Sequence, residues 1–304
     1  LSRGLGDVYK RQTLNIEKVY FKNERNDNLI GYYFSPDQYE NKSPILFAPS
    51  IGIKQSYYRN FCQWLCQQGH PVLSFDFNGI GESLKESPAK STAAIRYWGE
   101  YDLPAAIDCL LEKTLAKKII LVGHGVGGQL MGLSHNYDKL SHVVGIASSA
   151  GFIGNMQGLF KWKAWFFFNI YIPLCHLFFG YTKTKVIGMG EDLPPEVARE
   201  WALYCQKDGY IASAVGKTVF INYFNHINCP FTVIYSIDDH ISCKKNVESL
   251  LKTYPSTQAQ MVEINPSDYG FEHIGYNAYF KEKYQKLWPV LYHYIAQNYT
   301  HYYE

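Results

Sequence analysis

The chain has 304 residues, of which 47% carry apolar side chains and 18% are charged. Those proportions exclude an intrinsically disordered or collagen-like chain. Because 29 lysines and arginines stand against 27 aspartates and glutamates, the net charge of +2 provides no general field for a polyanion, and no nucleic-acid partner is expected. The length suits one large α/β domain that carries an insertion.

The seven cysteines are scattered and contain no CxxC pair. Neither a disulfide framework nor a zinc site is therefore expected, and no cofactor is predicted. We recognise no secretory signal, so a cytoplasmic location is the expectation. Residues 1–12, LSRGLGDVYKRQ, resemble a translated sequencing adapter and are left out of the fold prediction, which covers residues 13–298 and treats 299–304 as a tail.

The predicted secondary structure alternates between strands and helices. Residues 18–22 and 29–34 are predicted to form a leading antiparallel hairpin. Five uninterrupted apolar runs follow, each of strand length, at residues 45–48, 72–75, 119–122, 143–147 and 231–235. Helical patterns occupy residues 57–68, 102–115, 127–135 and 194–205. Because a parallel strand covered by helices on both faces is apolar on both faces, the runs predict a doubly wound, mostly parallel α/β sheet.

The alternation stops between residues 147 and 231, which predicts an insertion of about residues 150–228. Within it, residues 164–182 carry no formal charge and are bracketed by lysines. Such a run resembles a membrane span. A single crossing, however, would put strands of one sheet on opposite sides of a bilayer. The prediction is therefore an aromatic-rich cap over a pocket and no transmembrane span, with peripheral lipid contact left open.

The segment KKIILVGHGVGGQLM runs from an apolar strand into a glycine-rich turn. Gly123, Gly125 and Gly128 match G-x-G-x-x-G, the fingerprint of dinucleotide-binding sites. That fingerprint requires an acidic residue about 20 positions later to hold the ribose. Ser148 and Ser149 stand there instead. A dinucleotide-binding oxidoreductase is therefore a minor alternative.

The same segment also matches the nucleophile elbow, G-x-S-x-G, in every feature except one. Gly123 and Gly127 are the small residues that allow close packing around the turn, but the central residue is Gly125 rather than serine. The elbow holds its central residue at a positive φ, a strained conformation that costs other residue types about 1 to 3 kcal/mol and that glycine adopts freely. The glycine is therefore predicted to preserve the fold while removing the nucleophile.

Other residues stand where an elbow requires them. The segment Pro49-Ser50-Ile51-Gly52 follows the first core strand, and the backbone N–H groups of Ile51 and Val126 are the predicted oxyanion hole. The loop after the second core strand, DFNGIGES, is similar to the D-x-R-G-x-G-x-S loop of lipase-like proteins, with asparagine in place of arginine.

The acid and the base of a catalytic triad are predicted from chain order, which is nucleophile, acid, histidine. Asp239 is the predicted acid, with Asp238 as the alternative, and His273 is the predicted proton shuttle. The competing explanations are a turn or helix cap for Asp239 and a structural role for His273. His124 is predicted to be structural and packed beside the elbow.

With these residues the chain resembles the α/β-hydrolase superfamily, and within it a bacterial family of predicted α/β hydrolases related to serine aminopeptidases and lysophospholipases. The resemblance spans most of residues 17–298 and is carried by GHGVGGQ at 123–129, GMGEDLP at 188–194, the pair Asp238 and Asp239, and His273. That family ordinarily has serine at the position of Gly125. The resemblance implies the α/β-hydrolase fold and a lineage of ester and acyl hydrolases.

Three functions remain open at this point. The first is a degenerate serine hydrolase that binds a small hydrophobic acyl or ester ligand without turning it over. The second is an active ester or acyl hydrolase that uses Ser50, Ser148 or a water activated by His273, or in which Gly125 is a sequence error. The third is the dinucleotide oxidoreductase.

Overall fold

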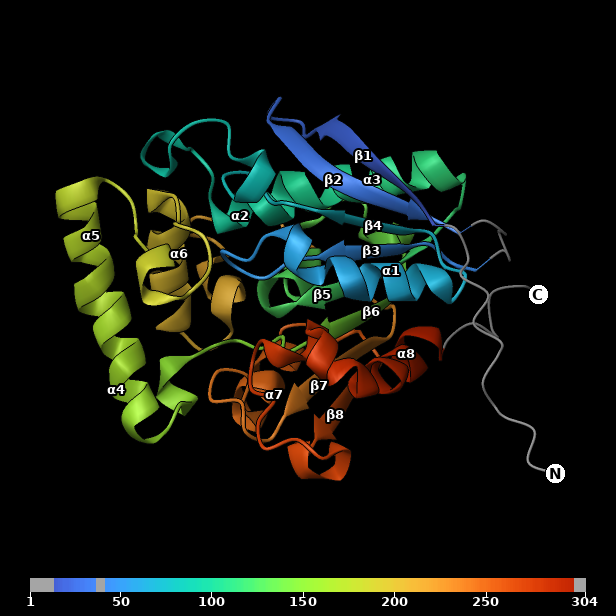
Figure 1. The fold of residues 1–304 in the computed structure, drawn as a ribbon. Coiled ribbons are helices and arrows are strands. Elements are labelled where there is room, and N and C mark those ends of the chain that lie inside the picture. Colours follow the sequence, from blue (N-terminus) through green and yellow to red (C-terminus); the bar gives the residue numbers. More distant parts are fainter. Residues whose placement is uncertain (1–13, 37–41, 298–304) are drawn as a thin grey trace.

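The protein is described by a computed structural model, which places residues 14–36 and 42–297. An eight-stranded sheet forms its centre, with the strand order β1-β2-β4-β3-β5-β6-β7-β8 (Figure 1). β1 (Asn15–Lys22) pairs antiparallel with β2 (Asn28–Ser35), β2 pairs antiparallel with β4 (Val72–Phe75), and all later neighbours are parallel. The predicted hairpin and mostly parallel sheet are confirmed. The adapter-like leader and the tail lie outside the described residues.

The core strands coincide with the five predicted apolar runs. Besides β4 they are β3 (Ile45–Ala48), β5 (Ile119–His124), β6 (Leu140–Ile146) and β7 (Phe231–Ser236), and every residue in them is buried. The sequence did not indicate β8 (Ala259–Ile264), which pairs with β7 at the sheet edge. Only its last residue is buried, so the strand lacks the continuous apolar run that marks a central strand.

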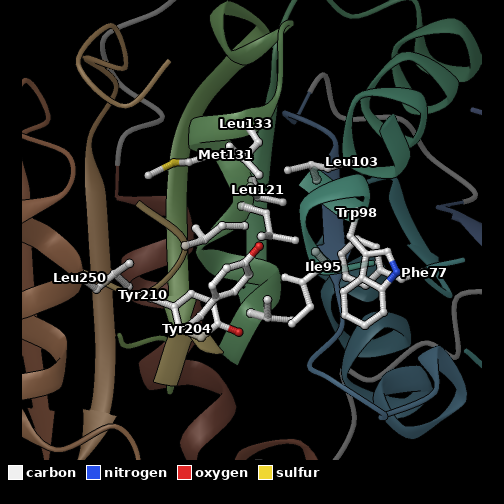
Figure 2. Packing of buried hydrophobic residues seen from close by; sticks show 14 of the residues in the cluster. Phe77, Ile95, Trp98, Leu103, Leu121, Met131, Leu133, Tyr204, Tyr210 and Leu250 are labelled. Carbon is white, nitrogen blue, oxygen red and sulfur yellow. The ribbon is translucent and has the colours of Figure 1, made fainter. Parts of the chain in front are cut away.

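Two helical layers cover the sheet. α1 (Arg59–Gln67) and α8 (Trp288–Ala296) contribute to one buried apolar cluster, and α3 (Leu103–Thr114) and α7 (Lys244–Lys252) contribute to another. Figure 2 shows part of the second cluster, in which Leu121 of β5 lies near Leu103 and Met131. The short helix α2 (Ile95–Tyr97) leads into a π-helical stretch, η4 (Trp98–Asp102).

The chain between β6 and β7 is mainly helical. α4 (Gly158–Phe166), the π-helical η9 (Phe167–Tyr171) and α5 (Ile172–Phe179) follow one another directly, and α6 (Pro195–Cys205) comes next. Figure 1 shows α4 and α5 along one side of the molecule, with α6 between them and the sheet. Within residues 14–36 and 42–297, no helix has the length and apolar character that crossing a membrane requires.

The remaining helical segments are short 3-10 helices. They are η1 (Gln55–Tyr58), η2 (Gly81–Ser83), η3 (Pro88–Lys90), η5 (Gly125–Gly128), η6 (Leu130–Leu133), η7 (Tyr137–Lys139), η8 (Ile153–Asn155), η10 (Lys185–Ile187), η11 (Tyr210–Ala214), η12 (Pro266–Tyr269), η13 (Ala278–Phe280) and η14 (Glu282–Leu287). The helix predicted over residues 127–135 therefore takes the form of η5 and η6 rather than one α-helix. Glycine disfavours a helix interior, and a Cβ on Gly132 would overlap the ring of Phe224.

Candidate active site

The turn after β5 has the tight geometry that the elbow motif predicts. Gly125 has a φ of +50°, which confirms the predicted positive value. A Cβ on Gly123 would overlap the backbone of Gly128, and one on Gly127 would overlap the carbonyl of Ala48. Side chains are therefore excluded at both flanking positions, because strand and turn approach each other too closely.

The space next to Gly125 is filled by a tyrosine. A Cβ on Gly125 would overlap the hydroxyl oxygen of Tyr276 and lie 2.6 Å from the Oγ of Ser50. The two hydroxyl groups are hydrogen-bonded to each other at 2.7 Å. The phenol of Tyr276 thus occupies the position that a serine side chain at residue 125 would take. Sequence reasoning missed Tyr276, and its only signal was its place three residues after His273.

Four residues form a closed ring of hydrogen bonds at this turn. The backbone N–H of Ser50 donates to the hydroxyl of Tyr58 (3.1 Å), which pairs with Nδ1 of His124 (2.8 Å). Nε2 of His124 pairs with the backbone carbonyl of Tyr276 (2.9 Å). Because a carbonyl only accepts, Nε2 carries the proton, and Nδ1 accepts from Tyr58. The bond between Ser50 and Tyr276 closes the ring, which holds Tyr276 by both its backbone and its side chain.

Burial keeps this ring uncharged. Desolvation lowers the pKa of His124 to about 3, although the hydrogen bond with the Tyr276 carbonyl favours the protonated form. Desolvation raises the pKa of Tyr276, against the smaller effect of its bond with Ser50. Near neutral pH the imidazole is therefore neutral and the phenol keeps its proton. Neither group is tuned to take a proton from a nucleophile at that pH.

Asp239 lies buried in the turn after β7, with 4% of its surface exposed. Its Oδ1 accepts hydrogen bonds from the backbone N–H groups of Ile241 (2.7 Å) and Ser242 (3.0 Å). Its Oδ2 is buried and has no hydrogen-bond partner among the described residues. Desolvation raises the pKa of Asp239 to about 6. The carboxylate therefore caps the turn with Oδ1.

His273 lies at the surface, where 84% of its side chain is exposed, and its Nδ1 is 3.7 Å from Oδ2 of Asp238. The Asp238 carboxylate also accepts hydrogen bonds from the backbone N–H groups of Ile274 (2.9 Å) and Gly275 (3.0 Å). Burial works in the opposite direction, but hydrogen bonds from Ser236, Gly275 and Ile274 hold the pKa of Asp238 below its usual value. Asp238 thus anchors the loop that carries both His273 and Tyr276.

The three predicted triad positions have different surroundings. Gly125 faces Tyr276 and Ser50, Asp239 caps a buried turn, and His273 pairs with Asp238 in solvent. The catalytic roles assigned to these residues stay predictions.

The predicted oxyanion loop after β3 packs against residues 188–194, the segment GMGEDLP, which is one of the segments that carry the resemblance. In GMGEDLP, the backbone N–H of Glu191 donates to the carbonyl of Gly52 (2.6 Å). A Cβ on Gly190 would overlap that same carbonyl, so glycine is required for the approach. The segment therefore supports the loop that carries Ile51. Val126 lies in η5, and the oxyanion role of the two N–H groups stays a prediction.

The loop DFNGIGES after β4 has a structural role in positioning this site. Oδ1 of Asp76 accepts a hydrogen bond from the backbone N–H of Gln55 (2.7 Å), and Oδ2 accepts one from Glu82 (2.9 Å). Gln55 begins η1, the segment that carries Tyr58. Asp76 therefore fixes the turn from which Tyr58 reaches His124.

The described residues provide no evident place for a metal or a dinucleotide at this turn. No group of three or more histidine, cysteine or acidic side chains in that part of the chain could hold a metal ion. A dinucleotide site needs open backbone at the glycines and a helix N-terminus. Here the turn continues as 3-10 segments, and no α-helix begins at it within the described residues.

An open groove of about 740 Å³ lies elsewhere, between β1 and α3. Its lining includes Lys18, Tyr20, Asp108 and Lys113, and none of the candidate site residues. The groove is therefore separate from the turn that carries Gly125.

Comparison with known proteins establishes the fold. No protein-family model matches this chain, and no curated protein matches it. Among solved structures, a soluble variant of monoglyceride lipase from Saccharomyces cerevisiae, in complex with a substrate analog, matches with a TM-score of 0.66 and 16% identity over 95% of this chain and 97% of that chain. A thermophilic esterase from Thermogutta terrifontis matches with a TM-score of 0.59 and 17% identity, over 92% and 98% of the two chains.

A hypothetical protein from Pseudomonas aeruginosa is similar to the same extent, with a TM-score of 0.60 and 13% identity over 92% of this chain and 94% of that chain. At identities this low, structural likeness establishes the fold alone. Together with the strand order, it shows that the chain has the α/β-hydrolase fold.

Proposed function

We propose that this protein belongs to a lineage of ester and acyl hydrolases and has lost hydrolysis by the serine route. The observation that carries the proposal is the pairing of Gly125 with Tyr276, whose hydroxyl fills the nucleophile position. Acyl transfer at an elbow requires a hydroxyl or thiol on the central residue, and glycine has neither. The lipase and the esterase of similar fold support the lineage.

The packing around residue 125 accommodates a glycine and no larger side chain. If Gly125 were a misread serine, the serine side chain and the Tyr276 phenol would need the same space. Tyr276 is moreover held there by the hydrogen bonds of its hydroxyl and its backbone carbonyl. A glycine at position 125 is thus compatible with the residues packed around it.

An active hydrolase that uses Ser50 is the second candidate. Its support is that the Oγ of Ser50 is close to the nucleophile position, at 2.6 Å from a Cβ built on Gly125. The side chain of Ser50 would have to lose its proton to Tyr276, whose raised pKa makes the phenolate scarce near neutral pH. Ser148 is a weaker candidate, because it is fully buried and its hydroxyl donates to the carbonyl of Gly125.

The expected ligand is a small hydrophobic acyl or ester compound, which the protein would bind without turnover. Two measurements test the proposal: hydrolysis of 4-nitrophenyl butyrate, and saturable binding of laurate followed by tryptophan fluorescence. We expect no hydrolysis above the rate in buffer and saturable binding of laurate. A hydrolysis rate that disappears in Ser50→Ala would overturn the loss of activity and establish the second candidate.

A further inference from the structure

The helix formed by α4, η9 and α5 has apolar side chains on the side that faces the protein. It runs unbroken from Gly158 to Phe179, which at 1.5 Å per residue gives a length of about 30 Å. Phe167 and Phe168 pack against Trp201 of α6, with ring centroids 5.4 and 5.2 Å apart. These contacts bury the face of the helix that lies against α6.

The opposite face of this helix is also apolar, and it is exposed. The largest exposed fractions belong to Leu159 (70%), Trp162 (68%), Leu177 (75%) and Phe178 (71%). We call this the outer face, and it further contains Trp165, Phe166, Ile170, Leu174 and Phe179. A helix at the surface of a globular protein normally carries polar residues on its outer side. Many large apolar side chains exposed on one surface element indicate a site of interaction.

All formally charged residues between Asp138 and Glu191 in the sequence are lysines. Lys161 and Lys163 lie in α4, and Lys183 and Lys185 follow α5, whereas the sequence contains no aspartate or glutamate between Asp138 and Glu191. The ammonium group of Lys183 lies 4.5 Å from the ring centroid of Phe179. Lys185 has an ion-pair partner in Glu191 at 3.4 Å. Lys161, Lys163 and Lys183 therefore flank the apolar surface with positive charge, whereas the charge of Lys185 is offset by Glu191.

We propose that the outer face docks onto the surface of a lipid bilayer that contains anionic lipids. Tryptophan and phenylalanine enter the interfacial region of a bilayer, and lysine side chains reach back to the headgroups. Anionic headgroups match the sign of the flanking charges. The helix lies along an edge of the molecule (Figure 1), so it can meet a flat surface without obstruction by the sheet.

A second copy of the chain is the less favoured partner for the outer face. A twofold symmetric contact would place each outer face against its own copy. Lys161 and Lys163 of α4 would then lie in an interface to which residues 139–190 contribute no acidic side chain. An anionic bilayer accommodates both the apolar and the charged parts of the surface. The proposal does not depend on the state of the site at Gly125.

Sedimentation with lipid vesicles tests the proposal in the full chain. One set of vesicles contains phosphatidylcholine alone, and the other contains phosphatidylcholine mixed with phosphatidylglycerol. We expect binding to the mixed vesicles and weaker binding to phosphatidylcholine. Lys161→Gln with Lys163→Gln should reduce this difference. Brominated lipids should quench the tryptophan fluorescence of the unmodified protein, because Trp162 and Trp165 belong to the outer face.

Substitutions on the outer face test whether it is the surface that contacts the vesicles. Leu177→Asp combined with Phe178→Asp should weaken binding to the mixed vesicles by at least about tenfold. Both side chains are exposed, so the unfolding temperature should stay unchanged. The matched control is Tyr20→Asp, because Tyr20 is 71% exposed on β1, which Figure 1 shows well apart from α4 and α5.

Three results would overturn the proposal. The first is failure of the unmodified protein to bind either type of vesicle. The second is equal weakening by the control variant and by the Leu177 and Phe178 variant. The third is a dimer in solution that the Leu177 and Phe178 variant dissociates while vesicle binding is absent, which would identify a second copy as the occupant.

Discussion

The hydroxyl group of Tyr276 occupies the position at which a side chain on Gly125 would begin. Each of these two residues therefore depends on the other: glycine leaves room for the phenol, and the phenol fills the space that glycine leaves. Filling it avoids the free-energy cost of a void in a closely packed interior. Under the proposed function, the missing nucleophile and the phenol that fills its place are parts of one arrangement.

Gly125→Ser alone should destabilise the protein. The variant combines a positive φ with overlap against Tyr276, so we expect the free energy of unfolding to fall by roughly 2 to 4 kcal/mol. Gly158→Ser is the matched control, because Gly158 has a similar φ of +57° and nothing within 4 Å of its Cβ position. It should cost only about 1 kcal/mol. Equal losses in the two variants, measured by chemical denaturation, would argue against the overlap.

Removal of the tyrosine ring should relieve part of that loss. We expect Gly125→Ser and Tyr276→Ala to be non-additive, with the double variant more stable than the sum of the single changes by about 1 kcal/mol or more. The reason is that the new serine then occupies space that the phenol has vacated. The four unfolding free energies form a double-mutant cycle. A coupling energy near zero would mean that the two residues do not share this space.

Acid should destabilise the protein through His124. The unfolded chain binds a proton at a histidine below a pH of about 6.5, whereas burial lowers the pKa of His124 to about 3 in the folded state. Between these values the unfolded state binds more protons, so stability falls as the pH falls. Relative to His124→Gln, the protein should lose roughly 3 kcal/mol between pH 7 and pH 4. Parallel pH profiles for the two proteins would contradict a buried neutral imidazole.

Titration of Asp239 should change the stability with pH in the direction opposite to that of His124. Its pKa is raised to about 6 by desolvation, so between a pH of about 4 and 6 the folded state binds more protons than the unfolded state. Stability contributed by the protonated carboxyl is therefore lost as the pH rises through this window. Relative to Asp239→Asn, which keeps the acceptor for Ile241 and Ser242, the protein should lose roughly 2 to 3 kcal/mol between pH 4 and pH 7.

This pH profile also distinguishes two arrangements of the site. If Asp239 paired with a protonated His273 in solution, the pKa of its carboxyl would be lowered. The relative stability would then stay nearly level from pH 4 to pH 7 and fall only at lower pH. That trend would contradict the geometry in which His273 pairs with Asp238.

The sequence contained enough information for the framework and for the bend at Gly125. The runs that became β3, β4 and β5 are apolar throughout because helices cover both faces of the sheet. The positive φ at Gly125 followed from the spacing of Gly123 and Gly127 around it. β8 gave no such signal, since most of its side chains are at least partly exposed.

The residue that fills the space next to Gly125 could not be predicted from the sequence in the same way. Tyrosine occurs 26 times in the chain, and apart from its place three residues after His273 nothing in the sequence marks Tyr276 as the residue that reaches Gly125. Its position depends on the loop conformation that Asp238 fixes through the backbone of Ile274 and Gly275. Because either aspartate can cap a turn, chain order alone could not decide which of Asp238 and Asp239 lies beside His273.

The central claim is that the unmodified protein has no activated serine at the elbow. The most direct measurement is the intact mass of the protein after incubation with a fluorophosphonate, which forms a covalent adduct with activated serine hydroxyls. We predict no adduct, because Gly125 has no hydroxyl and Ser50 is hydrogen-bonded to a protonated phenol. A stoichiometric adduct that peptide mapping assigns to Ser50 would contradict the account.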